Sequence, residues 1–267
     1  MKHFLNEFEQ KEIIKLYQEG FSNKKISERF NVHRTTIQRL LKKHDVKLHK
    51  RKSELICNDI FFNEYTKESC YWAGFILADG YIRKNSNNLH IKLQKKDYDH
   101  LIKFLRCLKI EEDDINKILK NRKNYTSIDL FINNLVHGLM KNFSIGNNKS
   151  LTAFIDNRIP NHLMNHFIRG YFDGDGSITN AGIYPTISIT GTINTLNAIM
   201  DFFIKTKIKK NHRAKIYIRS HNIIGSIAYQ GFPFLENFFA VIYNESHSLI
   251  ELERKRKKIN YFLNSRR

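Results

Sequence analysis

Residues 167–176 read FIRGYFDGDG, an apolar and aromatic run that ends in alternating acids and glycines. Three interpretations compete: a calcium loop, a tight turn, and the edge of a catalytic site. An EF-hand loop that began at Asp173 would need Gly at its sixth position and Glu at its twelfth. Ile178 and Tyr184 stand there instead, so the spacing excludes an EF-hand. A tight turn stays open, because Asp-Gly pairs favour turns.

A second copy of this stretch lies upstream. Residues 72–82, WAGFILADGYI, align without a gap with residues 168–178, IRGYFDGDGSI, so that Asp79 matches Asp175, 96 positions later. Each copy is followed by two strand patterns and a helix pattern: YIRK, LHIKLQ and YDHLIKFLRCL after the first, SITN, YPTISIT and NTLNAIMDFF after the second. Two halves with the same order of elements indicate an internal duplication, and therefore a single chain with pseudo-two-fold symmetry.

Both copies carry small residues four positions apart on one side of a predicted helix. They are Gly74 and Ala78 in the first copy, and Gly170 and Gly174 in the second. Such spacing lets two helix backbones approach closely. If the two helices pack along the pseudo-two-fold axis, Asp79 and Asp175 emerge side by side, and one pKa rises unless a cation sits between them. Mg²⁺ resolves that conflict and sets up metal-assisted attack on a phosphodiester.

The pair WAGFILADG and IRGYFDGDG resembles the two motifs of the LAGLIDADG homing endonucleases, in their double-motif monomeric form, over about residues 65–265. The resemblance implies an α+β fold with two pseudo-symmetric αββαββα repeats, whose antiparallel sheets form saddles over DNA, and cleavage of both strands. It also implies that Asp79 and Asp175 bind the metal, assisted by the backbone carbonyls of Ala78 and Gly174. Asp173 is matched by Leu77, a departure expected to cost little because this position does not bind metal.

Two further catalytic candidates rest on the same resemblance. Lys149, in GNNKSLTAF, resembles the basic residue that the family places near the scissile phosphate, and Gln94 resembles a strand-end residue that orders water. Outside such a family, a surface Lys or a strand-end Gln is usually only solvated. In the second half the corresponding positions are His247 and Thr190. If a second basic group is required, either His247 serves or the two strands are cut at unequal rates.

Strand alternation predicts which side chains face DNA. Leu89, Ile91 and Leu93 alternate with polar residues, as do Ile187 and Ile189. The outward candidates for DNA contact are Arg83, Lys84, His90, Lys92, Thr186, Ser188, Thr190, Lys215, Tyr217 and Arg219, with His247 added from the region of the site. An ordinary sheet with one wet face gives the same pattern. The net charge of +19, from 45 Lys and Arg against 26 Asp and Glu, favours a polyanionic partner.

The first 45 residues have a different pattern. Leu5, Phe8, Ile13, Leu16 and Tyr17 fall at roughly helical spacing, Gly20 is a plausible helix stop, and Ser22 is a good N-cap for a second helix. A third helix is expected from Arg34 to Lys43, with Ile37, Leu40 and Leu41 inward.

This third helix is the expected DNA-reading element. Its candidates for DNA contact are Arg34, Thr35, Thr36, Gln38 and Arg39. A small three-helix bundle with a solvated basic face is the alternative. The short turn and the polar, basic third helix favour a recognition helix in the major groove. The segment EGFSNKKISERFNVHRTTIQRLLKKH also resembles the helix-turn-helix of resolvases and transposases.

The expected organisation is therefore a helix-turn-helix domain at 1–45, a basic linker at 46–65, a first repeat at 66–158 and a second at 159–267. No run of about 18 apolar residues suggests a membrane span. Three cysteines without CxxC spacing suggest neither a disulfide framework nor a zinc site. We expect a soluble, intracellular protein of a bacterium, a phage-infected cell or an organelle, since the composition resembles the product of AT-rich coding. An intein is not expected, because the chain begins at Met1 without recognisable splicing blocks.

The leading functional hypothesis is a monomeric, site-specific, Mg²⁺-dependent endonuclease of double-stranded DNA, whose helix-turn-helix extends the footprint. A catalytically inactive LAGLIDADG and helix-turn-helix transcription regulator is the first alternative, although such a protein has no reason to keep both Asp79 and Asp175. An intron RNA maturase is the second. The helix-turn-helix argues mildly against it, because the major groove of A-form RNA is too narrow to read.

Overall fold

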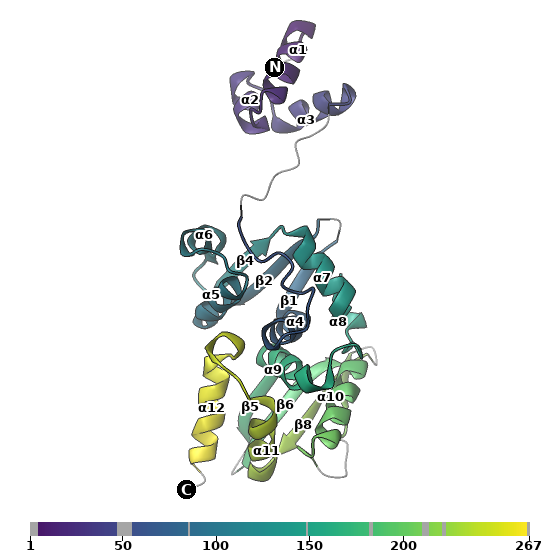
Figure 1. Cartoon of the computed structure of the whole chain (residues 1–267), viewed down its shortest axis with the longest axis vertical. Helices are drawn as coiled ribbons and strands as arrows, with labels where there is room; N and C mark the ends of the chain where they lie inside the picture. The colour runs from purple at the N-terminus through teal and green to yellow at the C-terminus, as the bar shows by residue number, and fades with distance from the viewer. Residues whose placement is uncertain are drawn as a thin grey trace. The chain divides into compact units, whose positions relative to one another are not determined.

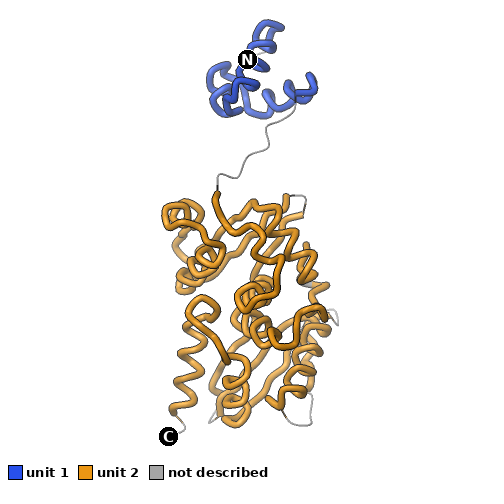
Figure 2. The backbone as a smooth tube through the Cα atoms, in the orientation of Figure 1, with its two compact units in different colours: residues 1–52 blue, residues 53–267 orange. Residues whose placement is uncertain are grey.

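The computed structural model describes residues 5–46, 55–84, 86–147, 149–181, 184–209, 214–220 and 223–265. The chain divides into two compact units, residues 1–52 and residues 53–267 (Figure 2). Each unit has its own apolar core, so each is described by itself.

The first unit consists of three helices: α1 (Glu7–Gln18), α2 (Asn23–Arg29) and α3 (Arg34–Lys43). Gly20 adopts a φ of +95° just after α1, and Ser22 caps α2 by accepting a hydrogen bond from the Lys25 amide. Both local signals were predicted from the sequence and are confirmed.

The core of this helical unit contains Ile13, Leu16, Tyr17, Ile26, Ile37, Leu40 and Leu41. The three inward residues predicted for α3 are therefore confirmed. Phe8 is a correction, because 75% of it is exposed. Ile13, Leu16 and Tyr17 define the buried stripe of α1, and Phe8 lies five positions before Ile13, about 140° around the helix.

The second unit contains two repeats of the same αββαββα order, which confirms the α+β fold class. The first repeat has α4 (Lys67–Asp79), β1 (Gly80–Arg83), β2 (Asn88–Gln94), α5 (Tyr98–Cys107), β3 (Lys120–Asn121), β4 (Tyr125–Leu130) and α7 (Asn133–Phe143). The second has α9 (Met164–Asp175), β5 (Gly176–Ala181), β6 (Tyr184–Thr192), α10 (Ile193–Lys205), β7 (Tyr217–Ser220), β8 (Ile224–Gln230) and α11 (Phe232–Ile242). Short elements join these: the 3-10 turns η1 (Lys95–Asp97), η2 (Asn161–Leu163) and η3 (Ser248–Ile250), and helices α6 (Glu112–Ile118) and α8 (Lys149–Thr152). Helix α12 (Glu253–Asn264) closes the chain.

The two antiparallel sheets have matching topology and register. Their strand orders are β1-β2-β4-β3 and β5-β6-β8-β7. Gly80 pairs with Ile91 in the first sheet, and Gly176 pairs with Ile189 in the second. Each strand that follows a motif thus begins directly after its aspartate, at the same place in each sheet.

Helices α4 and α9 lie side by side at the centre of the second unit (Figure 1). Nine consecutive residues of α4, Ser69 to Leu77, are buried. A helix that is apolar all round requires cover on every side, and here α9, the strands β1 and β2, and η3 from the second repeat all pack against α4. Thr66 caps α4 through a capping box with Ser69, which fixes where the helix begins.

The expected linker at 46–65 is shorter in the structure. Residues 47–54 lie outside the described part of the chain, but residues 55–65 pack on the second unit. Phe62 is fully buried, and the Asn58 amide donates to the Leu108 carbonyl at 2.7 Å. The basic run ends before these apolar residues begin, and their burial is what extends the unit toward the N-terminus.

Among the described residues, no helix has the length and apolar character needed to cross a membrane. Cys57, Cys70 and Cys107 are free thiols, and Cys70 is buried.

Candidate active site

The two motif helices approach each other more closely than side chains would allow. A Cβ atom added to Gly74 would lie 2.0 Å from the Phe167 carbonyl oxygen, and one added to Gly170 would lie 1.9 Å from that of Tyr71. Farther along, a Cβ on Gly174 would meet the Ala78 methyl group at 2.3 Å. The small residues predicted to bring the backbones together do so, and the two helices therefore end side by side at Asp79 and Asp175.

Asp175 is half-buried and Asp79 is more exposed to solvent, and the charges of the two side chains interact. Burial raises the pKa of Asp79, against the opposing charges of Lys255 and Lys149. The pKa of Asp175 rises to about 6, first because of burial and then because of the nearby Asp79 carboxylate. Lys149, Lys255 and a hydrogen bond from Tyr171 lower it only in part. The two carboxylates thus form the like-charge pair that the sequence predicted.

Lys149 lies at the end of the first motif helix, as expected. Its Nζ donates to the carbonyl oxygens of Leu77 at 2.6 Å and Ala78 at 2.7 Å. Burial lowers the pKa of Lys149 to about 8, although both aspartates oppose this shift. The ammonium group is therefore fixed at the end of α4, next to the two carboxylates.

Lys255 donates in the same way to carbonyl oxygens at the end of the second motif helix. The sequence prediction did not include this residue. Its Nζ donates to the carbonyl oxygens of Phe172, Gly176 at 2.6 Å and Gly174 at 3.3 Å. Burial lowers the pKa of Lys255 to about 8. The residue lies four and seven positions before the buried Ile259 and Phe262, on the apolar stripe of α12. That spacing was the available signal that this lysine, within the run ERKRKK, faces inward.

His247 does not lie at the end of the second motif helix, where the counterpart of Lys149 was expected. Its Nε2 lies 3.0 Å from Glu68, in the first turn of α4, whereas the aspartates stand at the opposite end of the motif helices. The prediction that His247 corresponds to Lys149 is therefore corrected: Lys255 corresponds to it. The reason is that the chain between α11 and α12 passes along the start of α4 before it turns toward the site.

A divalent cation fits the site with an incomplete protein donor set. No group of three or more His, Cys, Asp or Glu side chains in the described ranges could hold a metal ion. Asp79 and Asp175 each offer a carboxylate, and the carbonyls of Ala78 and Gly174, expected as further ligands, accept hydrogen bonds from the lysines. Mg²⁺ is commonly bound by one or two carboxylates, with water and substrate phosphate completing its shell. Burial raises the pKa of both carboxyls, and the Asp79 charge adds to the shift at Asp175, so a cation at this place would favour the charged form of both groups.

Gln94 is the last residue of β2 and is exposed. Since Gly80 pairs with Ile91, β2 continues past the start of β1 and places Gln94 at the sheet end nearest Asp79. Its predicted place at the strand end is confirmed. Its role in ordering water remains a prediction.

The predicted alternation is confirmed in β2 and β6, but β7 does not follow it, because Ile218, between the outward residues Tyr217 and Arg219, is 54% exposed. Leu89, Ile91, Leu93, Ile187 and Ile189 are buried. The outward residues are exposed or half-buried: Arg83, Lys84, His90, Lys92, Thr186, Ser188, Thr190, Lys215, Tyr217 and Arg219. In the first unit, Arg34, Thr35, Gln38 and Arg39 are exposed on α3, and Thr36 is half-buried.

The outward face of the first sheet carries a charged cluster that the sequence prediction did not include. Asp129 on β4 accepts hydrogen bonds from Arg83 at 3.3 Å and Lys120 at 2.7 Å, and its carboxylate lies 3.0 Å from His90 Nδ1. Burial raises the pKa of Asp129, but the contacts from Lys120 and His90 outweigh burial and lower it overall. Two of the predicted DNA-contacting residues are thus held in place by one carboxylate.

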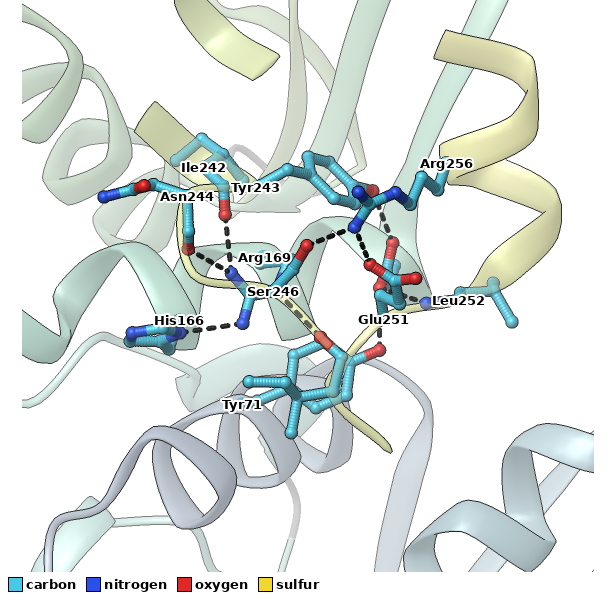
Figure 3. A network of polar contacts seen from close by, with 12 residues as sticks. Tyr71, His166, Arg169, Ile242, Tyr243, Asn244, Ser246, Glu251, Leu252 and Arg256 are labelled. Carbon is cyan, nitrogen blue, oxygen red and sulfur yellow. Dashed lines mark hydrogen bonds and ion pairs between the residues drawn. The ribbon is translucent and has the colours of Figure 1, made fainter. Parts of the chain in front are cut away.

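Asp173, expected to matter little, is buried among hydrogen-bond donors. It accepts hydrogen bonds from the hydroxyls of Tyr71 at 2.7 Å and Tyr243 at 2.8 Å, and from the Leu252 amide at 2.7 Å. One turn earlier on α9, Arg169 is fully buried and contacts the same part of the chain (Figure 3). Neither residue has a polar counterpart in the first motif, where Leu77 and Ala73 stand.

Comparison with known proteins identifies two segments. Residues 2–44 match the model of a helix-turn-helix domain, and residues 163–232 match that of a LAGLIDADG-like domain. Among curated proteins, the replication factor C small subunit of Methanocaldococcus jannaschii is 26% identical over 238 residues, which cover 76% of this chain and 12% of that protein. The chain thus spans only about an eighth of the length of this curated relative.

Solved structures with a similar arrangement include the LAGLIDADG meganuclease I-CpaMI bound to uncleaved DNA. It is 12% identical, with a TM-score of 0.48, over 75% of this chain and 92% of that one. Full-length DUF199/WhiA from Thermatoga maritima is 18% identical, with a TM-score of 0.42, over 79% of this chain and 65% of that one. The segment that matches the LAGLIDADG-like model contains α9 with Asp175 and the whole second sheet. The chain therefore carries a helix-turn-helix domain at its N-terminus, followed by a LAGLIDADG-like domain.

Proposed function

We propose that the chain is a site-specific endonuclease that cuts both strands of double-stranded DNA with a divalent cation, Mg²⁺ being the best fit. The observation that carries this proposal is the pair of interacting carboxylates at the adjacent ends of α4 and α9, where a different lysine donates to the carbonyls of each helix end. A purely structural helix pair would not need two interacting carboxylates, because their repulsion opposes folding.

The residues have separable roles in this proposal. Asp79 and Asp175 hold the cation, which supplies positive charge next to the scissile phosphate. Lys149 and Lys255 place fixed ammonium groups where negative charge develops in the transition state. Because each lysine contacts the end of a different helix, we assign each lysine to one DNA strand.

DNA binding is assigned to the outward faces of the two sheets and to α3. The net charge of +19 supports a polyanionic partner. Affinity should fall steeply with salt, with a slope of about −0.9 for each phosphate neutralised on duplex DNA. The helix-turn-helix would add base contacts beyond those of the sheets, and the chain would act as a monomer with internal pseudo-symmetry.

The test uses the chain's own genomic neighbourhood, with any interrupting element removed to restore the presumed target. This DNA is incubated with wild type, Asp79→Asn or Asp175→Asn, with and without Mg²⁺. Asp113→Asn is the matched control, since this acid is exposed on α6. We expect metal-dependent double-strand cutting by wild type and by the control, and loss of cutting or nicking only with either active-site variant.

Two other outcomes would overturn the proposal in favour of its alternatives. Tight, sequence-specific binding of DNA without cutting in any divalent metal would identify a transcription regulator. Specific binding to a folded intron RNA, with faster splicing and no DNA cutting, would identify a maturase.

A further inference from the structure

The two lysines of the site are held by different means. Lys149 belongs to α8, which immediately precedes the junction of the two repeats. Lys255 belongs to α12, which follows residues 243–252, here called the strap. The strap leaves α11 in the second repeat and crosses to the first, where Glu245 pairs with Lys67 at 2.6 Å and Lys103 donates to the Glu251 carbonyl at 3.2 Å. The position of Lys255 thus depends on the path of the strap.

A buried side chain of α9 donates hydrogen bonds to this strap. Arg169 donates from Nη1 to the Ile242 carbonyl at 2.8 Å, just before the strap, and from Nε to the Ile250 carbonyl at 2.8 Å, near its end. Figure 3 shows His166 beside the same guanidinium, at 2.7 Å from Nη2. Arg169 of α9 therefore contacts the chain near both ends of the strap.

Asp173 holds the point where the strap becomes α12. It accepts the Leu252 amide at 2.7 Å, and Leu252 is the N-cap residue of that helix. All three of its partners are donors, so the carboxylate acts as an acceptor at each contact. A negative charge at a helix N-terminus also interacts favourably with the helix dipole. Lys255 lies three residues beyond Leu252, in the first turn that this contact fixes.

The first repeat supplies an internal control. It builds the same helix, the same sheet and the same helix end with Leu77 and Ala73 at the positions of Asp173 and Arg169. The helix pair itself therefore does not require these polar residues. Burying a carboxylate and a guanidinium is costly unless their partners compensate, and every partner of Asp173 named here lies either in the strap or on α4. The presence of Asp173 and Arg169 in the second motif helix is thus explained by their contacts with the strap, and not by a requirement of the motif.

We propose that Asp173 is a positioning residue that fixes the start of α12, and so places Lys255 at the end of α9 for the cleavage of one DNA strand. This inference rests on the proposed endonuclease function. It predicts that losing the Asp173 contacts impairs one strand selectively, since Lys149 at the other helix end is held independently.

The test is single-turnover cleavage of the target duplex with each strand end-labelled separately. Asp173→Asn keeps the size of the side chain but leaves one acceptor oxygen in place of two, so it cannot keep both the Tyr243 contact at Oδ1 and the Tyr71 and Leu252 contacts at Oδ2, and it removes the negative charge at the start of α12. We expect one strand to be cut about tenfold or more slowly, and the other within about twofold of wild type. Lys255→Met should slow the same strand, and Lys149→Met the other.

The double variant Asp173→Asn with Lys255→Met isolates the positioning role. If Asp173 acts through Lys255, the double variant cuts the affected strand no more slowly than Lys255→Met alone, because the two effects are not additive. Tyr243→Phe, which removes one donor and preserves packing, covers the case in which Asp173→Asn fails to fold. It should give the same strand bias in a weaker form.

The outcomes separate the two proposals. If wild type cuts neither strand, both the proposed endonuclease function and this inference are wrong. A wild type that cuts both strands, with folded Asp173→Asn and Tyr243→Phe that slow the two strands equally or not at all, removes this inference alone. Additive losses in the double variant would also overturn it.

Discussion

The two repeats of the second unit share their backbone and differ in what supports the same chemical feature. In both, a motif helix ends in an aspartate, a lysine donates to carbonyls at that end, and the next strand starts at once. In the first repeat the supporting positions are Leu77 and Ala73, and in the second they are Asp173 and Arg169. The arrangement of charges at the site is thus repeated, while the means of holding it is not.

The outward faces of the sheets differ in a similar way. By strand register, Arg83, His90 and Asp129 in the first sheet match Thr179, Ser188 and Ala228 in the second. The first sheet therefore presents charged donors fixed around a carboxylate, and the second presents small hydroxyl and methyl groups. Under the proposed function, two halves with one topology would in this way read two different half-sites.

The largest expected effect on stability comes from disrupting the close approach of the two motif helices, to which both repeats contribute a glycine. Gly74→Ala and Gly170→Ala each place a methyl group within 2.0 Å of a backbone carbonyl oxygen across the helix pair. Neither backbone can move without separating α4 from α9, so we expect each change to destabilise the fold by about 3 kcal/mol or more. Urea unfolding measures the loss. Gly146→Ala, where an added Cβ meets only the Met140 methyl at 3.8 Å, is the matched control.

A clear difference in stability between the two glycine variants would show that the contact between α4 and α9 is not symmetric. The expected equality follows from the near-identical approach of each glycine to the opposite helix.

Most of this shared framework was predictable from sequence, because it depends on local patterns. The period-two alternation that buries Ile91 and Ile189 and exposes His90 and Ser188 is a property of strands alone. The motif glycines are interpretable because two copies are present, and the match of Asp79 to Asp175 follows from the alignment.

The parts that differ between repeats were not predictable, because they depend on distant contacts. The partners of Asp173 include Tyr243 and Leu252, more than 60 positions away, and no local pattern specifies that encounter. Lys255 is one of five basic residues in ERKRKK, and the strap decides which of them reaches the site. His247 was favoured by its position in the sequence, whereas the path of the strap places it beside Glu68.

A second prediction concerns the charge that the two repeats hold in common. Without metal, Asp79→Asn should stabilise the chain at pH 7, since it removes the charge that helps to raise the pKa of Asp175. With Mg²⁺ at about 100 times its dissociation constant, wild type should gain about 2.7 kcal/mol, and the variant should gain much less. Thermal unfolding with EDTA and with Mg²⁺ measures both, and the order of stability should reverse between them.

The pH dependence of wild type without metal has a definite sign. The pKa of Asp175 is raised to about 6 in the folded state, so the folded chain binds its proton more tightly than the unfolded chain. This contribution makes the protein more stable as the pH falls from 7 toward 5. Asp175→Asn should lack it, and an identical pH profile for the variant would contradict the assignment.

A third prediction tests the difference between the sheets. Asp129→Ala places in the first sheet the residue found at the matching position of the second. Arg83 and His90 then lose the carboxylate that holds them, and discrimination should fall by about 1–3 kcal/mol at the base pair they contact. Selection from random duplex DNA in Ca²⁺, followed by competition binding, measures this position by position.

Only one half-site should change. Ser188→Ala is the matched variant in the second sheet, and it should alter discrimination by less than about 1 kcal/mol, because a single hydroxyl contacts a base more weakly than a bidentate pair. Equal effects of the two variants would mean that the charged cluster has no special role in reading DNA.

The smallest effect is expected where the two repeats join. Asp156 accepts hydrogen bonds from Arg158 and from Ser144, which follows α7, and the neighbouring Ala153 carbonyl accepts the Thr192 hydroxyl at the start of α10. The Arg158 contact, opposed by burial and aided by Ser144, lowers the pKa of Asp156 to about 2. The folded state therefore favours the charged form, and its stabilisation is complete above the unfolded pKa and disappears as the pH falls through about 2. We expect Asp156→Asn to cost about 1 kcal/mol at pH 7 and almost nothing near pH 2, measured by urea unfolding across that range. If the cost were the same at both pH values, the contact would act through packing alone, and the charge at the junction would not help to hold the halves as one cooperative unit.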